Sequence, residues 1–232
     1  MEKELSNSEI FQNIEEYASE NHVPIIRKDE ILYLETLISE VIAEKKETFK
    51  KAIEEKNKNN EKSDILEDEF VFNILEIGTA IGYSSSKFAF IDNSIYIDTI
   101  EKDIGRCEIA KENIHKLGKN LSINIINGEA QNVLDQLIKK GKKYDFIFID
   151  ANKSKDKDYF IQSEELITDD GIIVCDNIYM SGLISKEEEE VPKKHRTIYR
   201  NIHEFLDYIN GKTDFKTELV DIADGLTVSY KI

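Results

Sequence analysis

The chain has 232 residues, 40% of them hydrophobic and 34% charged, which is the composition of a soluble globular protein with one sizeable core. Its formal net charge of −16 argues against non-specific coating of nucleic acid, because that binding depends on Lys and Arg neutralising phosphates. No apolar run approaches the roughly 18 residues of a membrane span and the first residues are charged rather than signal-like, so we expect a cytoplasmic protein without membrane contact.

Two amphipathic helices are predicted before residue 44. Apolar residues recur at helical spacing over 8–20, Pro24 breaks that pattern, and a second apolar stripe follows. The stripe comprises Leu34, Leu37, Ile38, Val41 and Ile42. Residues 44–68 are charged and polar with both signs interspersed, which predicts a solvated helix that frays into a mobile loop. We therefore divide the chain into an N-terminal helical region, 1–70, that contains this charged insert, and a second domain, 71–232.

From residue 71 onward, short apolar runs alternate with helical patterns. The strand candidates are 71–77, 95–100, 122–126, 144–149, 171–175, 215–222 and 225–231. The helix candidates are 82–91, 103–117, 130–140, 156–167 and 195–210. The first five strands alternate with helices, which predicts parallel pairing, and Asp224-Gly225 predicts an antiparallel hairpin at the end. The expected fold is α/β: a Rossmann-like seven-stranded sheet with a C-terminal antiparallel hairpin, plus N-terminal helices.

A glycine-rich turn joins the first strand candidate to a helix in the stretch 74–86, I-L-E-I-G-T-A-I-G-Y-S-S-S. Glu76, Gly78 and Gly82 form an E-x-G-x-x-x-G pattern, in which glycine lets the backbone turn tightly and approach a ligand. The spacing differs from the G-x-G-x-x-G of pyrophosphate sites. It resembles motif I of class I methyltransferases, whose S-adenosylmethionine carries no phosphate. A purely structural turn is the alternative.

Two further strand ends are candidates for nucleoside binding. Glu101 ends the second strand candidate, where an acid can accept both ribose hydroxyls, and the alternative is a solvated glutamate. Gly128, Glu129 and Ala130 follow the third strand candidate, where this fold places a residue beside the adenine. Their alternative is a simple helix N-cap.

Three oxygen-bearing residues follow two other strand candidates, F-I-F-I-D and I-I-V-C-D-N, which end in Asp150 and in Asp176-Asn177. In an open α/β sheet, ligands bind at the carboxyl ends of the strands, so these residues are expected to share one crevice. Two carboxylates and an amide oxygen suit Mg²⁺ or Ca²⁺ and do not suit zinc. Capping of the following helices is the alternative.

Lys153 lies three residues after Asp150. An ammonium near a dication and a cationic cofactor has its pKa lowered, which makes Lys153 a candidate general base, with Asp150 as a second catalytic residue. A surface lysine is the alternative.

The densest basic cluster, with Lys193, Lys194, Arg196 and Arg200, follows an acidic run. Beside a cleft, such a cluster could hold substrate phosphates, and a solvated helix start is the alternative.

Taken together, motif I, T-I-E, Y-D-F-I-F-I-D-A-N-K and V-C-D-N are similar to the cation-dependent O-methyltransferases, the family of the catechol and caffeoyl-CoA enzymes. Within that family, E-E-Y-A-S-E-N-H-V-P-I-I, L-E-I-G-T-A-I-G-Y-S, P-K-K-H-R and A-D-G-L-T-V-S most resemble the bacterial tRNA 5-hydroxyuridine methyltransferases. The similarity begins near residue 14 and excludes the insert. Two features depart from the pattern: the insert at 44–68 is long, and Ile26 stands where a methionine is expected.

The resemblance implies a role for each matching position. The S-adenosylmethionine contacts it implies are at Ile26, Ser84, Glu101, Gly128, Glu129 and Asp150. It also implies metal ligation by Asp150, Asp176 and Asn177, with Lys153 as base. Arg27 and the basic cluster are the candidates for contacts to tRNA. The expected reaction is Mg²⁺-dependent methylation of 5-hydroxyuridine in the tRNA anticodon loop, by a homodimer, and a small catechol-type substrate is the alternative.

Overall fold

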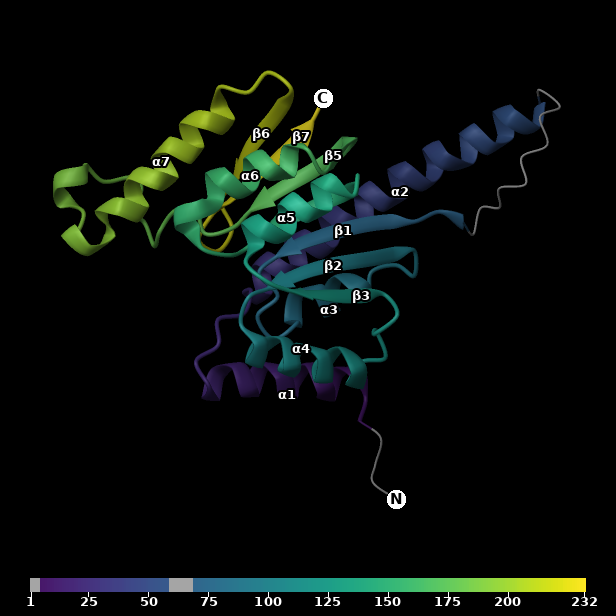
Figure 1. The fold of residues 1–232 in the computed structure, drawn as a ribbon, viewed down its shortest axis with the longest axis horizontal. Coiled ribbons are helices and arrows are strands. Elements are labelled where there is room, and N and C mark those ends of the chain that lie inside the picture. The colour runs from purple at the N-terminus through teal and green to yellow at the C-terminus, as the bar shows by residue number, and fades with distance from the viewer. Residues whose placement is uncertain (1–4, 59–68) are drawn as a thin grey trace.

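One mixed sheet of seven strands organises the part of the chain that the computed structural model describes, residues 5–58 and 69–232 (Figure 1). The strands are β1 (Phe72–Ile77), β2 (Ile95–Glu101), β3 (Ile123–Asn127), β4 (Tyr144–Ile149), β5 (Ile167–Cys175), β6 (Phe215–Val220) and β7 (Leu226–Lys231). Their order is β3-β2-β1-β4-β5-β7-β6. The first five strands are parallel, and β7 pairs antiparallel with both β5 and β6. The predicted α/β sheet with its closing hairpin is confirmed.

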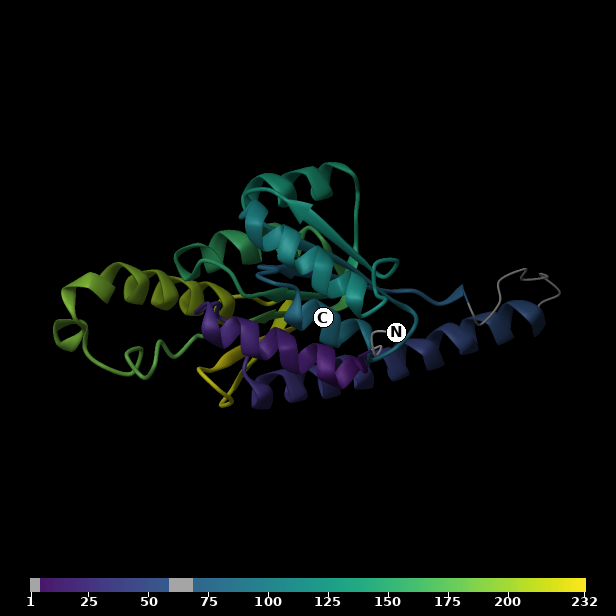
Figure 2. The same cartoon turned by 90° about the horizontal axis from the view of Figure 1, so that it is seen from below.

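Helices cover both faces of the sheet (Figure 2). They are α1 (Asn7–Glu20), α2 (Lys28–Lys58), α3 (Tyr83–Ala89), α4 (Ile104–Lys116), α5 (Ala130–Lys139), α6 (Asp156–Glu164) and α7 (Arg196–Asn210). Three short 3₁₀ helices are η2 (Lys153–Lys155), η3 (Glu188–Glu190) and η4 (Lys193–His195). In the described residues, no helix is both long and apolar enough to cross a bilayer.

The alternation of side chains along β1 explains the two-sided core. Phe72 and Ile74 pack with apolar residues of α1, α2, α3 and α4 on one face. Leu75 and Ile77 pack with apolar residues of α5, α6 and α7 on the other. Because a parallel sheet is buried on both faces, its strands are near-continuous apolar runs, as the F-I-F-I of β4 illustrates.

Helix α2 is one continuous helix of 31 residues, and its C-terminal part projects beyond the sheet (Figure 1). Its last buried residue is Ile42, after which Lys45 still pairs with Asp145 at 3.1 Å. The first half of the charged insert is therefore a solvated helix, as predicted. The predicted mobile loop at its end, 59–68, lies outside the described residues.

The boundary between α6 and β5 differs from the prediction. The helix expected over 156–167 ends at Glu164, and the strand expected over 171–175 already begins at Ile167. Asp169 and Asp170 are exposed in that first part of β5, which pairs with β4 across a register shift. The start of the strand was missed because the prediction relied on an apolar pattern, and the irregular start of β5 contains polar residues.

Candidate active site

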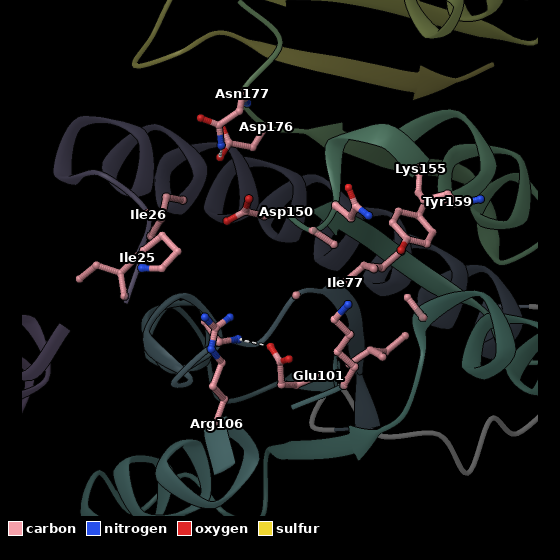
Figure 3. Close-up of a pocket in the computed structure, with 18 of the residues that line it drawn as sticks. Ile25, Ile26, Ile77, Glu101, Arg106, Asp150, Lys155, Tyr159, Asp176 and Asn177 are labelled. Atoms are coloured by element: carbon pink, nitrogen blue, oxygen red, sulfur yellow. Dashed lines mark hydrogen bonds between the residues drawn. The ribbon is translucent and has the colours of Figure 1, made fainter. Parts of the chain in front are cut away.

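The carboxyl ends of the parallel strands border a cavity of ≈ 500 Å³ (Figure 3). It lies where the strand order reverses, between β1 and β4, which is the place at which open α/β sheets bind ligands. Predicted cofactor residues that line it are Ile26, Gly78, Glu101, Gly128, Glu129, Ala130 and Asp150. Asp176, Asn177 and Arg27 also line it. Most of the site residues predicted from the sequence therefore line one cavity.

Gly78 allows the first turn to pass close to the end of β4. Its φ is +112°, and a Cβ on it would lie 2.0 Å from the carbonyl oxygen of Asp150. Real Cβ atoms do not approach backbone so closely, so any other residue would have to displace the Asp150 backbone. The glycine thus fixes the spacing between the turn and Asp150.

Glu101 is held in one orientation at the end of β2. It is 7% exposed, and its carboxylate accepts hydrogen bonds from the backbone N–H of Ala80 at 3.0 Å and of Asp103 at 2.9 Å. Each carboxylate oxygen has a second lone pair. The carboxylate can therefore receive further donors from the cavity, as the ribose prediction requires.

Three of the predicted cofactor residues do not line the cavity: Glu76, Gly82 and Ser84. Glu76 is fully buried below the turn, and its carboxylate accepts hydrogen bonds from the hydroxyls of Ser84, Ser85 and Thr99. Burial raises the pKa of Glu76, while the three hydroxyls favour its ionised form. Gly82 is the N-cap of α3 and packs closely on α4. These residues stabilise the turn from the side that faces away from the cavity.

Asp150, Asp176 and Asn177 lie on the opposite side of the cavity from Glu101 (Figure 3). The backbone N–H and the side-chain amide of Asn177 donate hydrogen bonds to the Asp176 carboxylate. Among the described residues, no three His, Cys, Asp or Glu side chains already converge in metal-binding geometry. The donor set still fits a hard cation, because it consists of two carboxylates and one amide oxygen, and one of the carboxylates is buried.

Glu30, from the first turn of α2, is a third acid in the cavity wall beside Asp150 and Asp176. It is 2% exposed and, when protonated, donates a hydrogen bond to Asp176. Burial, the contact with Asp176 and the charge of Asp150 raise the pKa of Glu30 to about 9. Burial and Asp150 also raise the pKa of Asp176. Lys153 opposes the shift at Asp176 and Arg27 opposes the shift at Glu30, but neither reverses it.

Lys153, in η2, lies next to Asp150 and Asp176, although it does not line the cavity. Its Nζ donates a hydrogen bond to the carbonyl oxygen of Asp176 at 3.0 Å and is 3.6 Å from Asp150 Oδ1. Burial favours the neutral amine, but the carboxylates of Asp156, Asp150 and Asp176 outweigh it and raise the pKa of Lys153. The predicted lowering concerned a lysine beside a dication and a cationic cofactor, and it stays a prediction; the carboxylates alone act in the opposite direction.

The family follows from comparison with known proteins. A family model described as O-methyltransferase matches residues 25–232. The chain belongs to this O-methyltransferase family. A caffeoyl-CoA O-methyltransferase of Populus kitakamiensis is 34% identical over 163 residues, which are 68% of this chain and 69% of that protein.

Solved structures agree with this assignment. A Staphylococcus aureus protein provisionally named a caffeoyl-CoA O-methyltransferase is 28% identical with a TM-score of 0.73, covering 96% of this chain and 92% of that one. An SAH-bound methyltransferase of Podospora anserina is 26% identical with a TM-score of 0.62, covering 69% of this chain and 71% of that one. The predicted methyltransferase fold is confirmed.

The predicted basic cluster of this O-methyltransferase lies outside the cavity. Arg196 donates hydrogen bonds to the carbonyl oxygens of Val191 and Glu189, and Arg200 pairs with Glu188. Lys193 and Lys194 are exposed in η4. The loop that carries them, between β5 and α7, projects beyond the carboxyl edge of the sheet (Figure 1).

Several cavity residues escaped the sequence analysis. Arg106, from the first turn of α4, lies beside Glu101 (Figure 3), and Tyr159, from α6, lines another wall. Glu30 is the third. In the sequence each is an ordinary polar residue of a helix, and only the packing of the helices turns it towards the cavity. A single sequence carries no signal for that.

Proposed function

We propose that this O-methyltransferase transfers a methyl group from S-adenosylmethionine to a substrate hydroxyl, with Mg²⁺ or a similar divalent cation. The observation that carries the proposal is one cavity with two kinds of wall. Glu101 and the turn at Gly128 suit a nucleoside on one side, and Asp150, Asp176 and Asn177 are oxygen ligands on the other.

The cofactor wall is preorganised. Glu101 is fixed by two backbone N–H groups, so it can accept ribose hydroxyls without reorientation. Gly78, Gly128 and Ala130 contribute no long side chains to this wall of the cavity. The SAH-bound relative supports a cofactor of this type.

The other wall prepares the reacting hydroxyl. Asp150, Asp176 and Asn177 would hold the cation, which as a Lewis acid supplies a lower hydroxyl pKa and an orienting contact. Lys153 Nζ, anchored by the Asp176 carbonyl, takes up the hydroxyl proton in this proposal. Its raised pKa depends on the negative charges of Asp156, Asp150 and Asp176, and a cation held by the last two would remove part of that effect. The oxygen then bonds to the methyl carbon, whose bond to sulfur breaks to leave S-adenosylhomocysteine.

For the substrate we propose 5-hydroxyuridine in a tRNA anticodon loop, which would become 5-methoxyuridine. Its 5-hydroxyl and neighbouring O4 form the vicinal oxygen pair that a divalent cation chelates. Lys193 and Lys194 are exposed on a loop beyond the carboxyl edge, and in this proposal they meet phosphates outside the cavity. A small catechol-type substrate is the second candidate. The relative named for caffeoyl-CoA favours it, as does the engagement of Arg196 and Arg200 within the protein.

Labelled S-adenosylmethionine tests the two substrates side by side. The enzyme is offered an anticodon stem-loop containing 5-hydroxyuridine or a catechol, with Mg²⁺ and then with EDTA. The proposal expects label in the RNA only with the metal. Label in the catechol alone would establish the second candidate, and label with EDTA would refute the metal.

Charge variants separate the substrates further. Replacing Lys193 and Lys194 together by Gln should weaken methylation of the RNA and leave any turnover of a catechol unchanged. Lys139 and Lys140 lie at the C-terminal end of α5, whereas the start of α5 lines the cavity. Both lysines are exposed, so replacing them by Gln provides a control with the same loss of charge. Equal effects of the two double variants on RNA methylation would contradict the assignment of the loop.

A further inference from the structure

We propose that Glu30 is an additional anionic ligand of the divalent-cation site, reaching it from α2 directly or through one water molecule. This inference rests on the proposed function, because it adds a residue to the site of Asp150, Asp176 and Asn177. It differs from the strand-end ligands in origin. Those residues follow β4 and β5, whereas Glu30 belongs to the N-terminal helical region.

The position of Glu30 is unusual for a glutamate at the start of a helix. An acid in the first turn interacts favourably with the helix dipole, and that role requires no burial. Asp29, its neighbour in the same turn, is exposed and meets that description. Glu30 is 2% exposed and lines the cavity instead.

One oxygen of Glu30 lacks a partner. Oε1 is buried and makes no hydrogen bond within the described residues. An unpaired buried carboxylate oxygen is costly, so it calls for a ligand that the cavity would provide. The other contact of the carboxyl group is with Asp176, itself 2% exposed.

The charges around Glu30 favour a cation over a further donor. Asp176 and Asp150 both act on it as like charges, and Arg27, which is exposed, is the cation that opposes them. Lys153, whose Nζ is 3.6 Å from Asp150 Oδ1, offsets part of this repulsion, and a divalent cation would offset the rest. Affinity for a hard cation rises with the number of charged ligands, and glutamate is long and flexible enough to turn from Asp176 towards a shared ion.

Binding of Mn²⁺ to the cofactor-free protein, followed through the electron paramagnetic resonance of the free ion, tests the inference without any need for activity. The Glu30→Gln variant keeps the shape of the side chain and removes its charge. We expect it to bind Mn²⁺ about 10- to 100-fold more weakly. The matched control, Glu44→Gln, removes the same charge from an exposed position about 21 Å further along α2 and should bind within twofold of the parent.

A second ion distinguishes a lost charge from a structural defect. Coulomb energy scales with the charge of the ion, so Glu30→Gln should weaken Tb³⁺ binding by a larger factor than Mn²⁺ binding. Local misfolding would weaken both ions by the same factor and would overturn the inference. Glu30→Asp, which retains the charge, should recover part of the affinity.

Asp150→Asn separates this inference from the proposed function. If Asp150→Asn abolishes Mn²⁺ binding but Glu30→Gln leaves it within threefold, Glu30 is not a ligand and the proposed site stands. If the parent binds no Mn²⁺, or binds it as well after Asp150→Asn, the proposed metal site fails and the inference fails with it. Loss in both variants supports both statements.

Discussion

Replacing Gly78 by alanine should damage stability and the metal site together. An L-residue in the left-handed region costs about 1–2 kcal/mol, and the φ of +112° lies beyond the well that alanine tolerates best. The new Cβ would meet the Asp150 carbonyl oxygen at 2.0 Å, and overpacking of this kind costs about 1–3 kcal/mol. The sum is about 2–5 kcal/mol, which for a chain of this size lowers the melting temperature by roughly 4–20 °C.

Gly118→Ala is the matched control. Gly118 also has a positive φ, +67°, but a Cβ there would meet nothing within 4 Å. Calorimetric melting should therefore show a smaller loss for this variant, from the backbone alone. Mn²⁺ affinity should fall in Gly78→Ala, because Asp150 must move, and stay unchanged in Gly118→Ala. Equal melting temperatures and equal Mn²⁺ affinities for the two variants would refute the reasoning.

Three other predictions concern single side chains. In EDTA, Glu30 keeps a proton that the unfolded chain releases near pH 4.5, so the free energy of unfolding should fall between about pH 5 and 9, by at most about 1.4 kcal/mol per pH unit. Urea unfolding should show this slope in the parent and a flatter one in Glu30→Gln; identical slopes would count against it. Glu101→Ala should weaken S-adenosylmethionine binding about 10- to 100-fold by calorimetry, and a change below twofold would exclude a ribose contact. Lys153→Met should lower kcat about 10²- to 10⁴-fold while the cofactor affinity stays the same, and an unchanged kcat would remove Lys153 as the base.

Predictions from the sequence succeeded where local pattern determines position. Asp150 and Asp176 follow apolar runs of a parallel sheet, and carboxyl ends of such strands meet at one edge whatever the loops do. Gly78 was recognised because it follows an apolar run in a glycine-rich pattern, and its φ of +112° explains why glycine stands there. The start of β5 was missed since Asp169 and Asp170 interrupt the apolar pattern at an irregular pairing.

Properties that depend on packing between distant segments could not be predicted. The pKa of Lys153 is raised by acids that include Asp156, and the sequence does not show that Asp156 is buried. Glu30 is 120 residues from Asp150, so its place beside the site depends on how α2 crosses the sheet. Arg200 pairs with Glu188 through a loop whose path has no sequence signature.

The most direct test of the account is a crystal structure of the protein soaked with Mn²⁺ and S-adenosylhomocysteine, with anomalous scattering to locate the ion. We predict an anomalous peak in contact with Asp150, Asp176 and Asn177, and the ribose hydroxyls within hydrogen-bonding distance of Glu101. A cofactor bound in the cavity with the ion elsewhere, or with no ion at all, would contradict the proposed metal-assisted methyl transfer.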